Sequence, residues 1–198
     1  MAIAAADVKK LRDQTGLGMM QCKRALEEAA GDFKKAIEIL RKLGLETVAS
    51  KAGRAAREGR IGSYVHSNNK IGVILELNCE TDFVANSDEF KQLLKDLCMQ
   101  VAATTPMTIA RKDVPADLVE KEKDIYRAQF KDKPDQVREK IVEGKLGTFY
   151  QRVCLMEQPF IKTPETTVGQ LIEGAIAKFK ENIQVRRFER FELGKDEE

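Results

Sequence analysis

Few side chains in this 198-residue chain are suited to proton transfer. His66 is the only histidine, and Tyr64 stands two residues before it, on the same side of an expected strand. Glu80 and Asp82 are a second acidic pair, but such pairs are common where 33% of residues are charged. No glycine-rich phosphate loop, GxSxG elbow or HExxH motif accompanies them. Because no set supplies nucleophile, base and orienting group together, the pattern favours a binding protein over an enzyme.

The cysteines give no metal site. They are widely scattered, at Cys22, Cys79, Cys98 and Cys154, with no CxxC pair and only one histidine in the chain. Zinc sites need closely spaced cysteine and histidine pairs, so we expect neither a metal nor another cofactor. The pattern is typical of reduced, mostly buried thiols in a cytosolic protein.

Composition narrows the class of partner. With 42% hydrophobic residues the chain has enough apolar side chains for a soluble, globular core. Its net charge of +2 is too balanced for a protein that coats nucleic acid, so we expect no direct nucleic-acid partner. The start has no signal-peptide pattern and no apolar run is long enough for a membrane span, so no membrane is expected. These features favour a bacterial cytoplasm, with an organelle matrix as the alternative.

The first 45 residues have the pattern of three short helices. The stretches DVKKLRDQTG, MMQCKRALEEAAG and DFKKAIEILRKLG each carry apolar residues at helical spacing. Asp7 and Asp32 are suitable N-caps, and Gly31 is a suitable C-cap. A module this small is only marginally stable alone, and such modules commonly dock on partners.

Two consecutive methionines, Met19 and Met20, cannot both face the core of such a module. An exposed methionine suits an adaptable contact surface. The alternative is that one is buried and the other partly covered.

A basic stretch follows the helices, ETVASKAGRAAREGR, with Lys51, Arg54, Arg57 and Arg60 at intervals of three. It has two interpretations, a basic strip on a helical linker or a linker whose charges are simply solvated. We favour the second, because regularly spaced charge usually marks a wet face.

A β-hairpin and a corner come next. RIGSYVH and KIGVILELNCE alternate as strands around the turn residues SNN. The following TDFVANSDEF leads into a long apolar-striped helix, with Asn86 and Glu89 as an expected capping box. Asp82 and Phe83 therefore occupy a strand-to-helix corner. The Phe83 ring either folds back into the core or is received by a partner.

The second half of the chain is mostly helical. Pro115 and Pro134 each open a helix, and Thr167 caps a further one. The stretch IQVRRFERFEL has the pattern of a closing strand, and an acidic tail ends the chain.

Two stretches resemble a known family. TGLGMMQCKRALEEAAGD resembles the TG-x-GMM-x-CK-x-AL signature of the elongation factor Ts family, and LELNCETDFVAN resembles its NC-x-TDFVA corner. VEGKLGTFYQRVCLMEQPF and RRFERFEL resemble later segments of the same family. The resemblance covers nearly the whole chain with its signatures in order.

The resemblance implies an α+β fold. It comprises an N-terminal three-helix, ubiquitin-associated-like domain, a helical linker, and a core with a three-stranded antiparallel sheet packed with helices. The sheet would consist of the hairpin and the last strand. The implied division is 1–45 for the helical domain, 46–58 for the linker, 59–194 for the core and dimerisation domain, and 195–198 for the tail.

The resemblance also implies a function that forms no covalent bond. The family is the guanine-nucleotide exchange factor for elongation factor Tu, a GTPase, and its corner enters the GTPase beside the magnesium and nucleotide site. Three groups of this chain match the family's contact positions: the corner Thr81, Asp82, Phe83 and Val84; the N-terminal Val8, Lys9, Met19 and Met20; and, as a weaker match, the hairpin residues Tyr64 and His66.

The chain departs from longer family members, which carry two core subdomains and an inserted coiled coil. We expect no room for these here, and therefore a homodimer that binds two GTPases in a two-plus-two complex. Two other functions stay open at this point. One is a ribosome- or RNA-associated accessory protein that uses the strip from Lys51 to Arg60, and the other is a small enzyme that uses His66.

Overall fold

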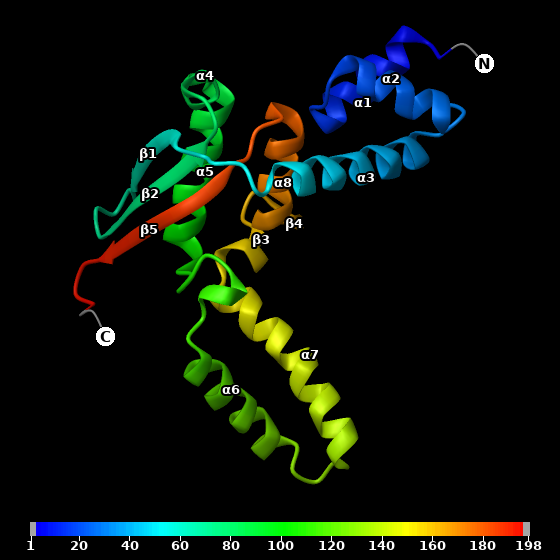
Figure 1. Ribbon diagram of the computed structural model, residues 1–198. Coiled ribbons are helices and arrows are strands. Elements are labelled where there is room, and N and C mark those ends of the chain that lie inside the picture. Colours follow the sequence, from blue (N-terminus) through cyan, green and yellow to red (C-terminus); the bar gives the residue numbers. More distant parts are fainter. Residues whose placement is uncertain (1–2, 196–198) are drawn as a thin grey trace. The chain divides into compact units, whose positions relative to one another are not determined.

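A computed structural model describes residues 3–195, which form an α+β fold (Figure 1). Of the expected acidic tail, residues 196–198 lie outside the described residues. The described chain forms two compact units. The first combines the residues through Gly59 with 78–87 and 172–184, and the second combines 60–77, 88–171 and the residues from Val185 onward.

Three helices open the chain, as predicted: α1 (Ala5–Thr15), α2 (Met19–Glu28) and α3 (Phe33–Lys51). Gly16 ends α1 with a left-handed φ of 67°, which glycine adopts without strain. Asp32 caps α3, since its Oδ1 accepts hydrogen bonds from two backbone N–H groups of the first turn. Their shared core consists of Val8, Leu11, Cys22, Ala25, Leu26, Ala29, Ala36 and Leu40.

Helix α3 continues beyond the expected start of the linker and ends at Lys51. Arg54 and Arg57 follow outside the helix, and Arg60 lies in strand β1 (Glu58–Val65). The four cations therefore share no helical face, which removes the geometry that a basic strip would need.

The central sheet has the order β1-β2-β5, with β2 at Ile71–Cys79 and β5 at Gln184–Glu192. The β1–β2 hairpin and the closing strand thus form the three-stranded antiparallel sheet that the resemblance implies. Helix α5 (Asp88–Thr104) packs on one face, where a Cβ added at Gly62 would meet the side chain of Leu94 at 2.5 Å. The buried residues of this layer include Val73, Leu75, Leu77, Phe90, Leu94, Leu97 and Val101.

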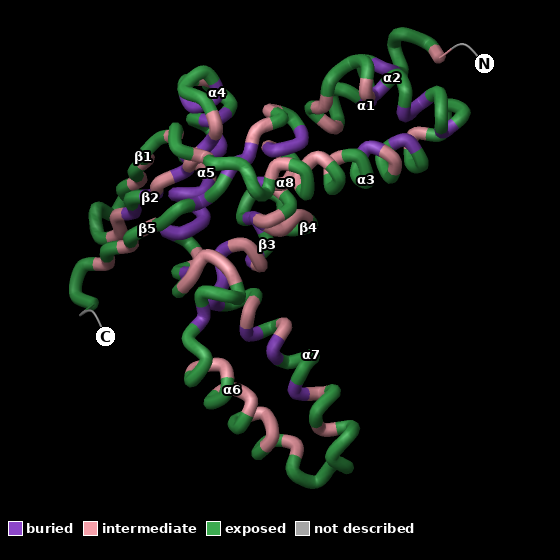
Figure 2. The backbone as a smooth tube through the Cα atoms, in the orientation of Figure 1, coloured by how far each residue is buried: buried purple, intermediate pink, exposed green. Residues whose placement is uncertain are grey.

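Two further helices, α6 (Ala116–Gln129) and α7 (Asp135–Val153), form an antiparallel helical hairpin (Figure 1). Buried residues lie along α7, whereas α6 has none (Figure 2). Arg127 on α6 donates to both carboxylate oxygens of Glu139 on α7, at 3.0 and 3.1 Å. Both helices were predicted, and Pro115 and Pro134 stand directly before them.

The 3₁₀ turn η1 (Arg111–Asp113) lies between α5 and this hairpin. The elements between the hairpin and the last strand are the 3₁₀ turn η2 (Leu155–Glu157), the strands β3 (Pro159–Phe160) and β4 (Thr163–Thr167), and helix α8 (Val168–Phe179). Thr167 caps α8 as predicted, because its hydroxyl accepts from the N–H of Gln170 while the Gln170 side chain accepts from the N–H of Thr167. Among residues 3–195, no helix is both long and apolar enough to cross a membrane.

Candidate functional site

The strand-to-helix corner is itself a short helix, α4 (Asp82–Asn86), which begins three residues after β2 ends. Thr81 is its N-cap, and the Thr81 hydroxyl accepts from the N–H of Val84 at 3.4 Å. Asn86, predicted to form a capping box with Glu89, is the last residue of α4, and α5 begins two residues later at Asp88. The capping box stays a prediction.

The ring of Phe83 points into solvent and is 84% exposed. Its two successors, Val84 and Ala85, are buried. One side of α4 therefore holds the helix in place while the other presents Asp82 and Phe83 outward. Of the two alternatives for Phe83, a ring folded into the core or a ring left for a partner, the structure has the exposed ring.

A carboxylate one hundred residues away in sequence fixes the start of α4. One oxygen of Glu181, Oε2, accepts from the backbone N–H groups of Glu80 and Thr81 at 3.0 and 3.1 Å. Its other oxygen, Oε1, accepts from the Thr81 hydroxyl at 2.6 Å. Three donors of the corner thus converge on one carboxylate, and hydrogen bonds to an ionised acceptor are the strong kind.

A reciprocal contact joins the same segments. The Glu80 carboxylate accepts from the backbone N–H of Asn182 at 2.7 Å, and this bond is the main reason that the pKa of Glu80 is lowered. Arg54 forms a 3.4 Å ion pair with the same carboxylate and lowers that pKa further. Asn182 is buried and donates its side-chain amide to the Arg54 carbonyl at 2.6 Å. The segment after β2, which contains Glu80, and the segment after α8, which contains Asn182, therefore hold each other in place.

The N-terminal helices expose three of the four residues predicted to dock. Lys9, Met19 and Met20 are exposed, Met19 to 43% and Met20 to 61%. Both methionines therefore face outward, rather than one of them. Val8 is 5% exposed and belongs to the module's core, so it supports this surface without forming part of it.

At the hairpin end of the edge strand β1, the hydroxyl of Tyr64 lies 3.0 Å from Nδ1 of His66, the residue directly after the strand. The predicted placement on one side of the strand is therefore correct. Tyr64 is half-buried and His66 is exposed, at the hairpin end of the strand.

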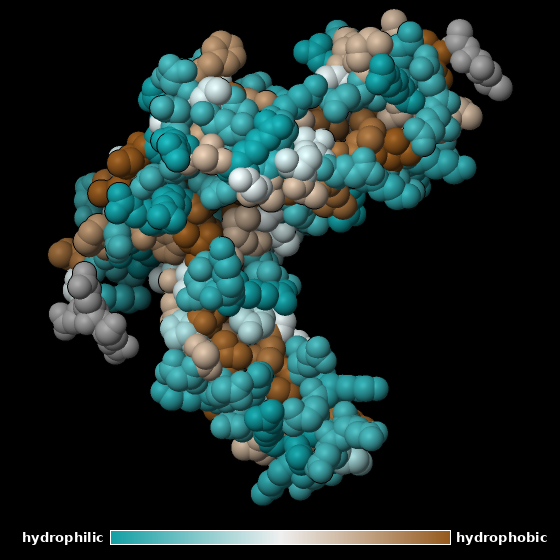
Figure 3. Space-filling model, viewed as in Figure 1, coloured by the Kyte–Doolittle hydropathy of each residue, from teal (hydrophilic) through white to brown (hydrophobic). Residues whose placement is uncertain are grey.

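The sheet face opposite α5 is apolar and exposed. Side chains alternate along strands, so the residues that neighbour the α5-facing positions point the other way. Those exposed by 48% or more are Ile61, Val65, Ile74, Phe191 and Leu193, and we call them the outer sheet face. Brown, hydrophobic side chains lie over this sheet in Figure 3.

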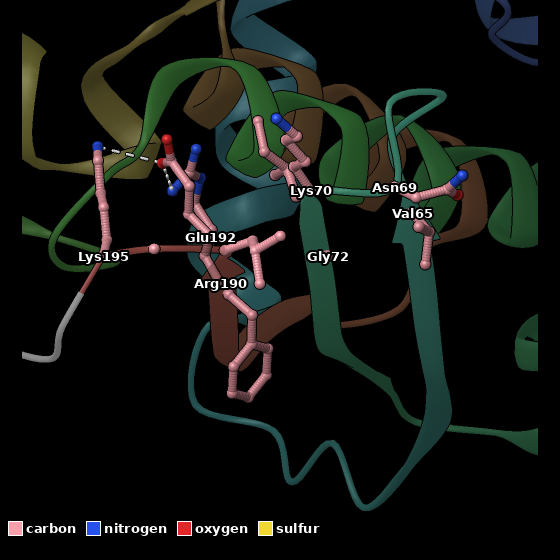
Figure 4. Close-up of a pocket in the computed structure, with 11 residues that line it drawn as sticks. Val65, Asn69, Lys70, Gly72, Arg190, Glu192 and Lys195 are labelled. Carbon is pink, nitrogen blue, oxygen red and sulfur yellow. Dashed lines mark hydrogen bonds and ion pairs between the residues drawn. The ribbon is translucent and has the colours of Figure 1, made fainter.

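A shallow depression borders the outer sheet face where the β1–β2 turn meets the end of β5 (Figure 4). Val65, Asn69, Lys70, Gly72, Arg190, Phe191, Glu192 and Lys195 are among its lining residues. Glu192 forms ion pairs with Arg190 at 2.6 Å and with Lys195 at 3.1 Å. The single carboxylate of the lining thus pairs with two of its three cations, Arg190 and Lys195, and Lys70 is the third.

The four cysteines are buried free thiols, as predicted. Burial raises the pKa of both Cys79 and Cys98 to about 11, which keeps them protonated near neutral pH. Within residues 3–195, no group of three or more histidine, cysteine, aspartate or glutamate side chains is arranged to hold a metal ion.

Comparison with known proteins places this geometry in a family. A family model described as Elongation factor TS matches residues 3–195. The chain belongs to the elongation factor Ts family. Similar proteins named Elongation factor Ts come from Thermodesulfovibrio yellowstonii, 58% identical over 199 residues with both chains fully covered, and from Fervidobacterium nodosum, 59% identical with 98% of this chain and all of that protein covered. A third, from Thermotoga petrophila, is 56% identical and covers 98% of each chain.

Family membership makes the chain a translation elongation factor. Sequence reasoning found the corner itself but missed Glu181 and Asn182, which hold it. Neither residue stands in the two signature stretches, and no periodicity links positions 81 and 181. The outer sheet face was also missed. Its signal was the imperfect alternation of β5, where Phe191 falls on the exposed side.

Proposed function

We propose that this protein is the guanine-nucleotide exchange factor for elongation factor Tu, and that Asp82 and Phe83 enter the GTPase beside its magnesium and nucleotide site. It would form no covalent bond. One observation carries the proposal: Phe83 is 84% exposed on a helical turn whose other face is buried. A ring already held in place loses little conformational entropy on docking, and aromatic side chains dominate binding interfaces.

The physical basis is competition for one site. A bound GDP is held through its phosphates and through Mg²⁺, which bridges phosphate oxygens and protein ligands. A ring inserted beside that ion displaces the surrounding elements and weakens both sets of contacts. Asp82 adds a carboxylate that competes for polar partners there. Because coupling between two ligands is reciprocal, GTP binding then releases the exchange factor.

Other surfaces supply affinity in this proposal. Lys9, Met19 and Met20 form a contact surface on the N-terminal helices, with Val8 supporting it from the core. Methionine side chains adapt to a partner's shape at modest cost. Tyr64 and His66, which are hydrogen-bonded at the hairpin end of edge strand β1, are a further contact to the GTPase.

Release of a fluorescent GDP analogue from elongation factor Tu tests the proposal, with this protein in catalytic amount. The wild type accelerates release, and Phe83→Ala loses most of that acceleration while its unfolding curve stays unchanged. Ile125→Ala on α6 is the matched control, since it removes an apolar side chain that is 51% exposed elsewhere. Acceleration that survives Phe83→Ala would refute the role of the ring, and a folded wild type without activity would refute the function.

We also propose that the protein is a homodimer that binds two GTPases. The outer sheet face supports this, because several large apolar side chains exposed on one face of a protein commonly mark an interface. Light scattering at micromolar concentration is expected to give the mass of two chains, and Phe191→Asp to give that of one. A monomeric wild type with full exchange activity would contradict the dimer.

The division into a helical domain (1–45), a linker (46–58), a core (59–194) and a tail (195–198) belongs to the same proposal, as does a cytoplasmic location. Limited proteolysis tests the division, since cleavage is expected first between α3 and β1.

A further inference from the structure

The corner that carries Phe83 is held by a residue that the family signatures do not include. We propose that Glu181 is a positioning residue for nucleotide exchange, whose carboxylate fixes the cap of α4 and through it the direction of the Phe83 ring. This inference rests on the proposed exchange function. Glu181 would not contact the GTPase or the nucleotide.

The first step in the argument is the geometry of the Thr81 hydroxyl. A hydroxyl has one hydrogen and two lone pairs. The Thr81 hydroxyl gives its hydrogen to Glu181 Oε1 at 2.6 Å, so its lone pairs are left to accept the N–H of Val84. Glu181 therefore sets the orientation in which Thr81 caps the helix.

The second step concerns the backbone that leads into the corner. The N–H groups of Glu80 and Thr81 both point at Glu181 Oε2, at 3.0 and 3.1 Å. Two consecutive backbone groups aimed at one oxygen restrict the path of the chain between β2 and α4. A ring two residues further on inherits that restriction, because Phe83 lies in the first turn of the helix.

The third step is the way in which Glu181 is itself held. Lys180 has a left-handed φ of 58°, a conformation that a non-glycine residue rarely adopts, and its N–H caps the end of α8 at the Ile176 carbonyl. The next residue but one, Asn182, is buried and bonded to both Glu80 and Arg54. Glu181 thus stands between two fixed neighbours, and strained backbone of this kind tends to accompany function.

The hydrogen bonds of Glu181 reach only the residues that precede Asp82 and Phe83. The Glu181 carboxylate accepts hydrogen bonds from Glu80 and Thr81, and none from Asp82 or Phe83. Glu181 therefore orients Asp82 and Phe83, the pair proposed to enter the GTPase, through the residues that precede them. This is the arrangement expected of a device that pre-organises a binding element and so lowers the entropic cost of docking.

The first test measures the corner without any partner. In Glu181→Ala, hydrogen exchange of the Glu80 and Thr81 amides, followed by NMR, should accelerate about 10- to 100-fold. Core amides of β2 and α5 should keep their wild-type rates. Glu165→Ala, which removes an exposed carboxylate on β4, is the matched control and should change neither set. Unchanged corner amides in Glu181→Ala would overturn the proposal.

The second test separates positioning from general destabilisation. Glu181→Ala should lower the maximal rate of GDP release while the half-saturating concentration stays within about twofold, because the other contact surfaces remain. Glu181→Gln, which keeps an acceptor oxygen, should recover part of the rate. In a Phe83→Ala background Glu181→Ala should cost no further rate, since it acts through the ring that is gone.

Two results in this second test would contradict the inference. Full additivity of Glu181→Ala and Phe83→Ala would show that Glu181 acts independently of the ring. A rise in the half-saturating concentration at unchanged maximal rate would make Glu181 part of a docking surface. A folded wild type that fails to accelerate GDP release would refute both the proposed function and the exchange role of Glu181. The amide measurement would still test whether the hydrogen bonds of Glu181 hold the corner.

Discussion

The corner and the N-terminal helices present exposed apolar side chains in opposite ways. Phe83 stands on a short helix whose cap and preceding backbone are bonded to one carboxylate. Met19 and Met20 stand on the first turn of α2, above a small core of mostly short side chains. A rigid ring suits a wedge that must displace something, whereas flexible methionines suit a contact that must conform. In the proposed function, the first surface changes the exchange rate and the second supplies affinity.

The largest expected effect is a loss of stability in the three N-terminal helices. Leu26 is fully buried in the core of the three helices, so Leu26→Ala leaves a cavity and should cost about 2–5 kcal/mol of that module's unfolding free energy. Chemical denaturation followed by circular dichroism measures the loss. Leu45→Ala is the matched control, because Leu45 on α3 is 47% exposed.

In the exchange assay, Leu26→Ala should raise the half-saturating concentration and leave the maximal rate within about twofold of wild type. The corner lies outside the weakened helical core and is held by its own network. A maximal rate that collapses with the helices would contradict the division of labour.

The next effect concerns the exposed methionines of α2, which can be removed without unfolding the helices. The double variant Met19→Ala, Met20→Ala removes exposed side chains only, so the unfolding free energy should change by less than about 0.5 kcal/mol. Its half-saturating concentration should rise about tenfold at constant maximal rate. Met107→Ala, which alters a methionine that is 58% exposed elsewhere, should leave both values unchanged. A reduced maximal rate in the double variant would mean that the methionines act in the exchange step.

The smallest effect is a pH dependence at the corner. The backbone N–H of Asn182 and the Arg54 cation lower the pKa of Glu80 in the folded protein. A carboxyl with a lowered pKa stabilises the fold above its ordinary pKa, and this contribution is lost as the pH falls through the folded value. The Asn182 amide shift should therefore be constant between about pH 6 and 8 and change below about pH 4. Glu80→Gln should abolish that change, and a wild-type shift that is flat down to denaturation would contradict the assignment.

Local chemistry made much of the fold predictable. Asp32 and Thr167 indicate where helices begin, because their side chains cap the first turn. The alternation of Val73, Leu75 and Leu77 indicates a strand with one buried face. These signals act over a few residues, so they survive without knowledge of the tertiary structure. The helical hairpin α6–α7 was predicted as two helices, but its assembly was not, because pairing depends on contacts such as Arg127 with Glu139.

The site was predictable only in part. The corner carries a recognisable motif, so Asp82 and Phe83 could be predicted as site residues. The exposure of Phe83 could not be decided from its sequence neighbours. The hydrogen bonds between Glu181 and the corner join segments one hundred residues apart, and no local pattern predicts such a contact. The burial of Val8 and the exposure of both methionines likewise depend on how three helices close around a small core.

The most direct measurement compares Phe83→Ala with the Met19→Ala, Met20→Ala variant in one GDP-release titration against elongation factor Tu. The account predicts that Phe83→Ala lowers the maximal rate at least about tenfold with the half-saturating concentration nearly unchanged, and that the methionine variant does the reverse. Equal shifts of both parameters in both variants would contradict it, because the corner and the N-terminal helices would then contribute to exchange in the same way.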